Sequence, residues 1–71
     1  MAKYLMSIIE KLDALEHAIT TTDLASLLQV GKTVIYDMVR RGTLPCIRIG
    51  YAVRFDPHEI AQWLRRRSRA V

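Results

Sequence analysis

The segment that decides the fold is residues 20–42, TTTDLASLLQVGKTVIYDMVRRG. It begins with Thr20, whose hydroxyl can accept from a backbone N–H three positions along and so start a helix. Apolar residues then recur at helical spacing on both sides of a short connection that contains glycine. Gly42 ends the segment, and glycine readily adopts the left-handed conformation found after helices. We therefore predict two short helices, at about residues 21–29 and 32–41.

Two short helices joined by a tight turn form the helix-turn-helix layout. Successive residues of a helix are rotated by about 100°, which places Ile35, Met38 and Val39 together on one side of the second helix. The other side offers a hydroxyl, a phenol, a carboxylate and cations, which are groups that contact base edges and phosphates. These residues are Lys32, Thr33, Tyr36, Asp37, Arg40 and Arg41. Alone, such a side would be an ordinary solvated surface, but after a turn and before a basic hairpin we interpret it as a recognition surface.

Asp37 differs from its neighbours on that surface because phosphate repels a carboxylate. Its oxygens could accept from the amino group of a cytosine. They could also pair with Arg40 or Arg41, three and four residues farther along the helix, and hold a guanidinium in place. We favour the pairing.

Residues 46–55 alternate apolar residues with arginines, which predicts a two-stranded hairpin. A three-residue loop at residues 50–52 would put all four apolar side chains on one face, whereas a two-residue loop would mix the faces. We therefore expect the longer loop. The expected pairs are Ile49 with Val53, Arg48 with Arg54, and Ile47 with Phe55.

This register sets Arg48 opposite Arg54 on the outer side of the hairpin. Like charges in that position destabilise a sheet by roughly 0.2–1 kcal/mol, and an anion between or above them would remove the penalty. A phosphate strand or the minor groove of a duplex supplies such an anion. Alternatively, both side chains extend into solvent. Tyr51, at the tip of the hairpin, would contact the nucleic-acid backbone or cap the turn.

Two longer helices are expected to flank these elements. The first, over residues 3–18, has one narrow apolar stripe, which packs on the chain's own core or pairs with another chain as a coiled coil. We favour packing on the core. The stripe consists of Leu5, Ile8, Leu12, Leu15 and Ile19. The last helix, over residues 57–67, begins with the strongest start signal in the chain, Asp56 followed by Pro57.

The charge of the chain is unevenly distributed. The 71 residues have a net charge of +4, of which residues 1–19 contribute −1 and residues 20–71 contribute +5. A polyanion is the natural partner of the basic part. The single cysteine, Cys46, cannot form an internal disulfide and fits a reducing compartment.

Several function classes lack their sequence signals. We expect no membrane span, because the sequence has no apolar run of about 18 residues, and no signal peptide. His17 and His58 have no cysteine or carboxylate at metal-ligand spacing. The sequence has no glycine-rich phosphate loop and no nucleophile with a visible base. We therefore predict a protein that is not an enzyme and that needs no metal or cofactor.

A series of short segments between about residues 19 and 64 follows a specific order. The segments are Ile19-Thr20, Leu27-Leu28-Gln29-Val30, Val34-Ile35-Tyr36, Arg40-Arg41-Gly42-Thr43-Leu44-Pro45, Ile47-Arg48-Ile49-Gly50, Val53-Arg54-Phe55, Asp56-Pro57-His58-Glu59-Ile60 and Trp63-Leu64. Together they resemble the excisionase-type DNA-binding domain, in the winged helix-turn-helix group related to MerR-type regulators. The resemblance implies that the helix at residues 32–41 enters the major groove and that the hairpin contacts the minor groove or its phosphates.

The chain departs from the pattern of that family at a few positions. The family often has serine where Gly31 stands, glycine where Gln29 stands, and an aromatic residue where Val53 stands. It also often has arginine where Asp37 stands, so this chain lacks one phosphate contact that the resemblance would imply. Residues 1–18 lie outside the resemblance.

We therefore expect a mainly α fold with a small two-stranded β-wing, a winged helix-turn-helix, in one domain over residues 1–71. Its parts would be an N-terminal amphipathic helix (1–18) and a core (19–67). The expected DNA-binding residues are Lys32, Thr33, Tyr36, Asp37, Arg40, Arg41, Arg48, Tyr51 and Arg54.

The expected function is binding of double-stranded DNA, either as an excisionase-like recombination directionality factor or as a small transcriptional regulator. The partners would be DNA, an integrase or recombinase, and further copies of the chain as a homodimer or a cooperative oligomer. The alternative is a protein-interaction adaptor that uses the first helix and docks an acidic protein on its basic half. We expect a cytoplasmic protein of bacterial, phage or mobile-element origin.

Overall fold

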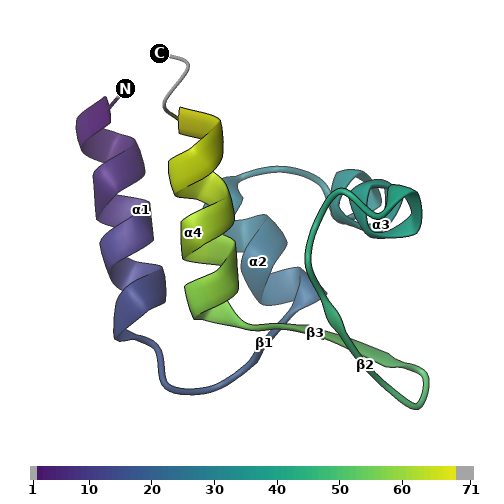
Figure 1. Ribbon diagram of the computed structural model, residues 1–71. Helices are drawn as coiled ribbons and strands as arrows, with labels where there is room; N and C mark the ends of the chain where they lie inside the picture. The colour runs from purple at the N-terminus through teal and green to yellow at the C-terminus, as the bar shows by residue number, and fades with distance from the viewer. Residues whose placement is uncertain (1, 69–71) are drawn as a thin grey trace.

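The computed structural model describes residues 2–68 of the backbone and the side chains of residues 7–67 (Figure 1). The elements are α1 (Ala2–Ala14), β1 (Ile19–Thr20), α2 (Thr21–Leu28), α3 (Lys32–Arg41), β2 (Ile47–Ile49), β3 (Ala52–Phe55) and α4 (Pro57–Ser68). Four helices and a small antiparallel sheet form a mainly helical winged helix-turn-helix, which confirms the predicted fold class.

Capping residues set the boundaries of three helices. The hydroxyl of Thr20 accepts from the backbone N–H of Asp23 at 3.1 Å and starts α2. A carboxylate oxygen of Asp56 accepts from the backbone N–H of His58 at 2.9 Å and starts α4. Gly42 ends α3 with a φ of 76°. The predicted bounds of α2, α3 and α4 are confirmed to within one residue.

The predicted first helix is too long. Helix α1 ends at Ala14, and residues 15–18 form an irregular connection. The sequence has no stop signal at this point. The chain leaves the helix here because Ile19 belongs to β1, where it pairs with Phe55 of β3.

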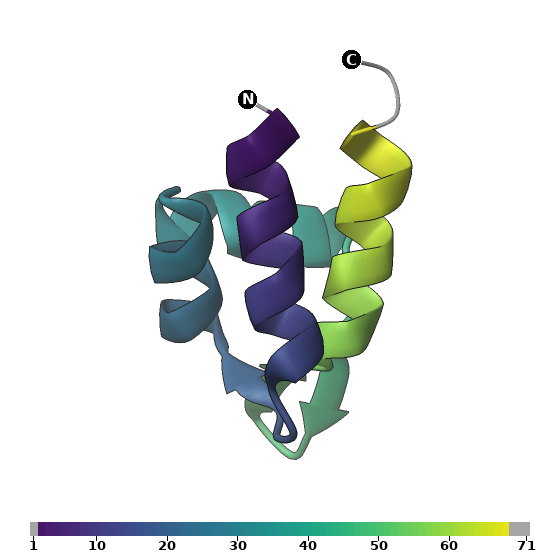
Figure 2. The same cartoon turned by 90° about the vertical axis from the view of Figure 1, so that its left-hand side faces the viewer.

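Helix α1 packs on the chain's own core rather than standing free for another chain. Ile8, Ile9 and Leu12 are buried in the core cluster, while the side chain of Leu5 lies outside the described part. Helices α1 and α4 lie side by side and run in opposite directions (Figures 1 and 2). The stripe on α1 thus supports the fold, which is the alternative that the sequence favoured.

The sheet has three strands in the order β1-β3-β2, where the sequence predicted two. The additional strand, β1, contains only Ile19 and Thr20. Both residues also match helix signals, an apolar stripe and an N-cap, so the sequence does not reveal the strand. Its pairing with β3 joins the hairpin to the start of α2.

The register of the hairpin also differs from the prediction. Gly50 and Tyr51 form a two-residue loop, so the predicted three-residue loop, with Arg48 opposite Arg54, is wrong. The observed Cα partners are Ile47 with Arg54, Arg48 with Val53, and Ile49 with Ala52. Gly50 has a φ of 60°, as the first central residue of a type II′ turn requires. Aligning the apolar residues would gain little, because every residue of β2 is exposed.

Each helix contributes a fully buried residue to one core. Leu12 of α1, Leu24 of α2, Ile35 of α3 and Ile60 of α4 are each 0% exposed, as is Phe55 of β3. A further tie comes from the indole of Trp63 on α4, whose Nε1–H donates to the backbone carbonyl of Thr43 at 2.8 Å. The connection that follows α3 is therefore fixed to α4, and α3 is held firmly from its inner side.

Candidate nucleic-acid interface

Helix α3 is anchored along one side only. Ile35 is fully buried, and Met38 and Val39 are partly buried against the core, which confirms the predicted apolar side. Tyr36 remains 48% exposed. The four other residues exposed on α3 that the sequence assigned to a recognition surface are Lys32, Thr33, Arg40 and Arg41. These residues therefore stand on a rigid support and face solvent.

Helix α3 and the hairpin lie at the opposite end of the molecule from α1 (Figure 1). Helices α2 and α4 lie between them, and α3 crosses behind α1 and α4 in the second view (Figure 2). A long partner could therefore lie across α3 and the hairpin without touching α1.

A groove of about 290 Å³ brings α3 and the hairpin together. Tyr36 of α3 lines it, as do Tyr51 and Arg54 of the hairpin. The rest of the lining consists of Ala52 and Val53 of β3 and of three threonines at residues 20–22, where β1 passes into α2. Tyr36 and the guanidinium-bearing residue Arg54 thus share one concave surface, as the recognition hypothesis requires.

The two arginines of the hairpin do not form the expected pair. Because Arg48 lies opposite Val53 and Arg54 lies opposite Ile47, their side chains project from different faces of the hairpin. The repulsion that the sequence predicted between them is absent, and so is the argument that an anion must relieve it. Arg54 instead donates from Nη1 to the carbonyl of Val53 at 2.9 Å.

The corrected register exposes apolar residues that the sequence reading placed on a covered face. Ile47 is 41% exposed and Ile49 is 63% exposed, and both share a face with Arg54. Tyr51, at the tip, is fully exposed. The hairpin therefore offers apolar contacts as well as cations. Its Ile-Arg-Ile alternation, read with a two-residue loop, is the signal that would have shown this.

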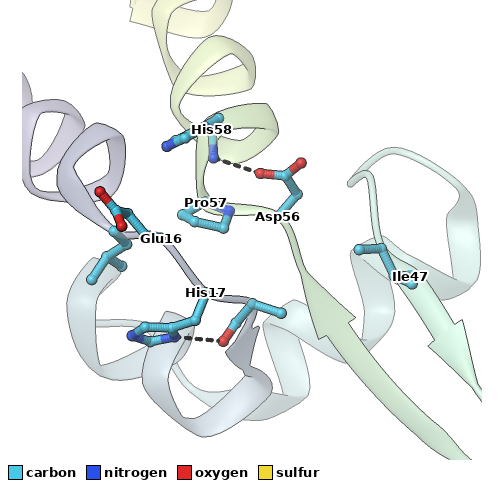
Figure 3. Close-up of a pocket in the computed structure, with 8 residues that line it drawn as sticks. Glu16, His17, Ile47, Asp56, Pro57 and His58 are labelled. Atoms are coloured by element: carbon cyan, nitrogen blue, oxygen red, sulfur yellow. Dashed lines mark hydrogen bonds between the residues drawn. The ribbon is translucent and has the colours of Figure 1, made fainter.

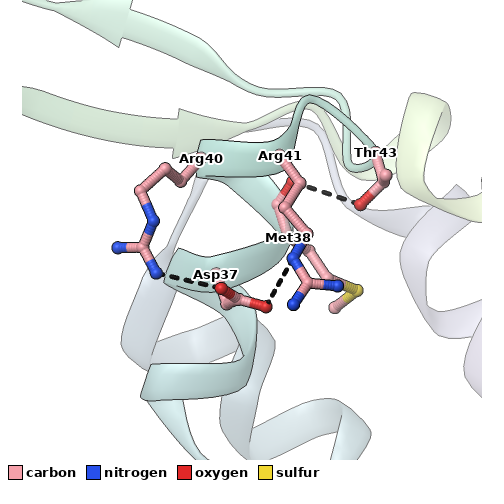
Figure 4. A network of polar contacts seen from close by, with 5 residues as sticks. All are labelled: Asp37, Met38, Arg40, Arg41 and Thr43. Atoms are coloured by element: carbon pink, nitrogen blue, oxygen red, sulfur yellow. Dashed lines mark hydrogen bonds and ion pairs between the residues drawn. The ribbon is translucent and has the colours of Figure 1, made fainter.

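Asp37 pairs with both arginines that follow it (Figure 4). Its Oδ1 lies 2.9 Å from Nη2 of Arg40, and its Oδ2 lies 3.1 Å from Nε of Arg41. The arginine side chains are 76% and 71% exposed, and the aspartate side chain is 35% exposed. Of the two roles considered for Asp37, the structure shows the pairing, and it involves both guanidinium groups.

A second hollow lies between the α1–β1 connection, the start of α4 and Ile47 of β2 (Figure 3). None of the predicted DNA-binding residues lines it. His58 places its ring Nε2 3.0 Å from the carbonyl of Asp13, and His17 places Nδ1 2.9 Å from the carbonyl of Ala18. Both histidines thus contact backbone, and no cluster of three potential metal ligands occurs among the described residues.

The arginine run at the end of α4 is partly used within the fold. Arg65 forms an ion pair with Asp13 of α1, and the guanidinium of Arg67 lies 4.5 Å from the ring centroid of Trp63. Arg66 is exposed, and Arg69 lies outside the described residues. Within residues 2–68, no helix is long and apolar enough to cross a membrane.

Comparison with known proteins agrees with this geometry. A family model for the helix-turn-helix domain matches residues 18–68. YvgK of Bacillus subtilis (strain 168), an uncharacterised protein, is 36% identical over 44 residues, which cover 62% of this chain but only 14% of that relative. No solved structure matches the chain. Since the family model covers well over half of its length, the chain belongs to the helix-turn-helix domain family, and α2, the turn and α3 form its helix-turn-helix.

Proposed function

We propose that the protein binds a specific sequence of double-stranded DNA, as an excisionase-like recombination directionality factor or as a small transcriptional regulator. Helix α3 enters the major groove, and the hairpin lies on the minor groove or its flanking phosphates. The observation that carries this proposal is the shared groove, to which α3 contributes Tyr36 and the hairpin contributes Arg54. In other words, a helix anchored on its inner side presents its polar side next to a basic hairpin.

The sizes and charges of the two elements support this arrangement. Helix α3 has 10 residues, so it is about 15 Å long, and the major groove is about 12 Å wide and accepts one helix. The helix has three cations and one acid, and the hairpin has two arginines and no acid. Both elements therefore attract phosphate. Helix α4 also carries three arginines, but Arg65 pairs with Asp13 and Arg67 lies over the ring of Trp63.

The proposal gives a role to each predicted DNA-binding residue other than Asp37. Thr33, Tyr36 and Arg40 contact bases or groups next to them, because they project from the middle of the exposed side of α3. Tyr51 contacts the backbone from the tip of the hairpin. Lys32, Arg41 and Arg54 engage phosphates, and Arg48 does so from the other face of the hairpin.

One small module binds DNA only modestly, so neighbouring copies or a DNA-bound integrase or recombinase would add affinity. The adaptor hypothesis, in contrast, needs an accessible apolar stripe on α1. Ile8, Leu12 and Ile19 of that stripe are buried. DNA binding is therefore the proposal that we retain.

Selection from a random-sequence duplex library tests the proposal. We expect a recurring motif, and we expect Arg40→Ala to weaken binding to it by about 1–3 kcal/mol, which is roughly 5- to 150-fold. Lys11→Ala is the matched control, because Lys11 is an exposed residue of α1 and its replacement removes one cation on the far side of the molecule. Failure to enrich any motif, or equal weakening by both variants, would contradict the proposal.

A further inference from the structure

We propose that Asp37 sets the sequence selectivity of α3, by weakening its binding to arbitrary DNA more than its binding to the target. This inference rests on the proposed function of α3 as the recognition helix. It assigns a specificity-determining role to the one acidic residue of the exposed side of that helix.

The geometry gives each carboxylate oxygen its own guanidinium. Oδ1 of Asp37 pairs with Arg40 and Oδ2 pairs with Arg41, at 2.9 and 3.1 Å (Figure 4). Each contact uses one donor nitrogen, Nη2 of Arg40 and Nε of Arg41, whereas a guanidinium has five N–H donors. Both arginines can therefore stay on the carboxylate and still donate to a base or a phosphate.

Folding does not require these contacts. Ion pairs between residues three or four positions apart on an exposed helix add little stability, because water screens them and the side chains lose freedom. The Asp37 side chain is 35% exposed and the two arginines more than twice that. A carboxylate held between two guanidiniums on a surface that faces DNA therefore calls for a reason other than stability.

The carboxylate of Asp37 has different effects on binding to arbitrary DNA and on binding to the target sequence. Phosphate attraction supplies nearly all non-specific binding, so an acid on the interface weakens binding to every sequence. At the target, Arg40 also donates to a base, and this contact requires a fixed direction. A guanidinium already held by Asp37 loses less freedom when it binds, which offsets part of the repulsion. The ratio of target to non-target affinity therefore rises.

The test compares Asp37→Asn with the parent protein on two duplexes of equal length, the selected sequence and a scrambled one, over a series of salt concentrations. Asparagine keeps the size of the side chain and removes its charge. We expect about three- to tenfold tighter binding to the scrambled duplex, with a salt slope steeper by about one. We expect a smaller gain, or a loss, on the selected duplex.

Glu10→Gln is the matched control, because it makes the same charge change at an exposed residue of α1, and α1 lies far from α3 (Figure 1). It should leave the affinity ratio unchanged, and Asp37→Glu should keep most of the ratio by restoring the charge. In a chain that already carries Arg40→Ala and Arg41→Ala, Asp37→Asn should no longer change the ratio, since the effect acts through these arginines.

The outcomes separate this inference from the proposed function. If the parent protein prefers the selected duplex and Asp37→Asn changes both affinities equally, the role of Asp37 in selectivity is overturned and the DNA-binding proposal stands. If the parent protein binds both duplexes alike, both proposals fail together. A fall of at least threefold in the ratio for Asp37→Asn alone supports the inference.

Discussion

The two ends of the molecule differ in the exposure of their apolar side chains. On the α1–α4 side, Ile9 and Leu12 are at most 1% exposed. On the α3–hairpin side, Tyr36 is 48% exposed, Ile49 is 63% exposed and Tyr51 is fully exposed. Burial of apolar area stabilises the fold, whereas exposed apolar groups next to cations are available to a partner. Ile35 and Phe55 tie the α3–hairpin end to the same core, but among the described residues the exposed large apolar side chains gather at this end, which is the proposed binding surface.

Polar contacts follow the same division. Asp13 of α1 joins α4 through the side chain of Arg65 and through the ring of His58. These contacts connect parts of the chain that are far apart in sequence. The ion pairs on α3, in contrast, lie within four residues of each other. The α1–α4 end, here called the scaffold end, is thus cross-linked. The side chains of the α3–hairpin end, the proposed binding end, are oriented mostly by near neighbours.

The largest expected effect tests the scaffold end. Leu12→Ala removes a side chain that is 0% exposed, so we expect the free energy of unfolding to fall by about 2–5 kcal/mol in urea titrations. Ile49→Ser, on the exposed hairpin, should change it by no more than about 0.5 kcal/mol. Equal destabilisation by the two variants would remove the distinction between the ends.

The next effect tests the binding end. Arg54→Ala should weaken DNA binding by about 1–3 kcal/mol, lower the salt slope by about one, and leave the melting temperature nearly unchanged. Arg66→Ala, on the exposed side of α4, is the control for total charge. Fluorescence anisotropy at several salt concentrations measures the affinity and the salt slope of both variants. A larger loss for Arg66→Ala would move the interface to the other end.

A smaller effect concerns the turn that sets the hairpin register. Gly50 has a φ of 60°, and a side chain in this region is strained by about 1–2 kcal/mol, so Gly50→Ala should destabilise the hairpin and weaken DNA binding. Gly31 has a φ of −72° and open space around an added Cβ, so Gly31→Ala lacks that strain. Hydrogen exchange of the β3 amides compares the stability of the hairpin in the two variants. Similar exchange in both variants would argue against the two-residue loop.

The smallest expected effect is an increase in stability. Gln29 ends α2 with a φ of 58°, where glycine is unstrained, so Gln29→Gly should raise the free energy of unfolding by about 1 kcal/mol or less. The gain is limited because the Gln29 side chain donates to the carbonyl of Ser26 at 2.7 Å. Thermal unfolding measures it, and DNA affinity should not change. A clear loss of stability would show that the side-chain contact outweighs the backbone strain.

Local chemistry made much of the fold predictable. Thr20, Asp56 and Gly42 mark helix ends by groups within a few residues, and the structure uses them in that way. The two sides of α3 and the pairing of Asp37 with Arg40 also follow from spacing along one helix. In each case the deciding contacts lie within about one helical turn.

Longer-range choices were not predictable from the same signals. The expected hairpin register assumed a buried face, but β2 is exposed throughout, so the turn at Gly50 decides the pairing instead. Strand β1 depends on Ile19 meeting Phe55, which is 36 residues away. The end of α1 at Ala14 follows from that same contact rather than from a local stop signal.

The central claim is that DNA lies on α3 and the hairpin, and a chemical-shift titration of the backbone amides with the selected duplex tests it most directly. The account predicts that the large shifts gather at residues 32–41 and 48–54 and around the start of α2, while α1 remains almost unperturbed. Shifts concentrated on α1 and α4, with α3 unaffected, would contradict it.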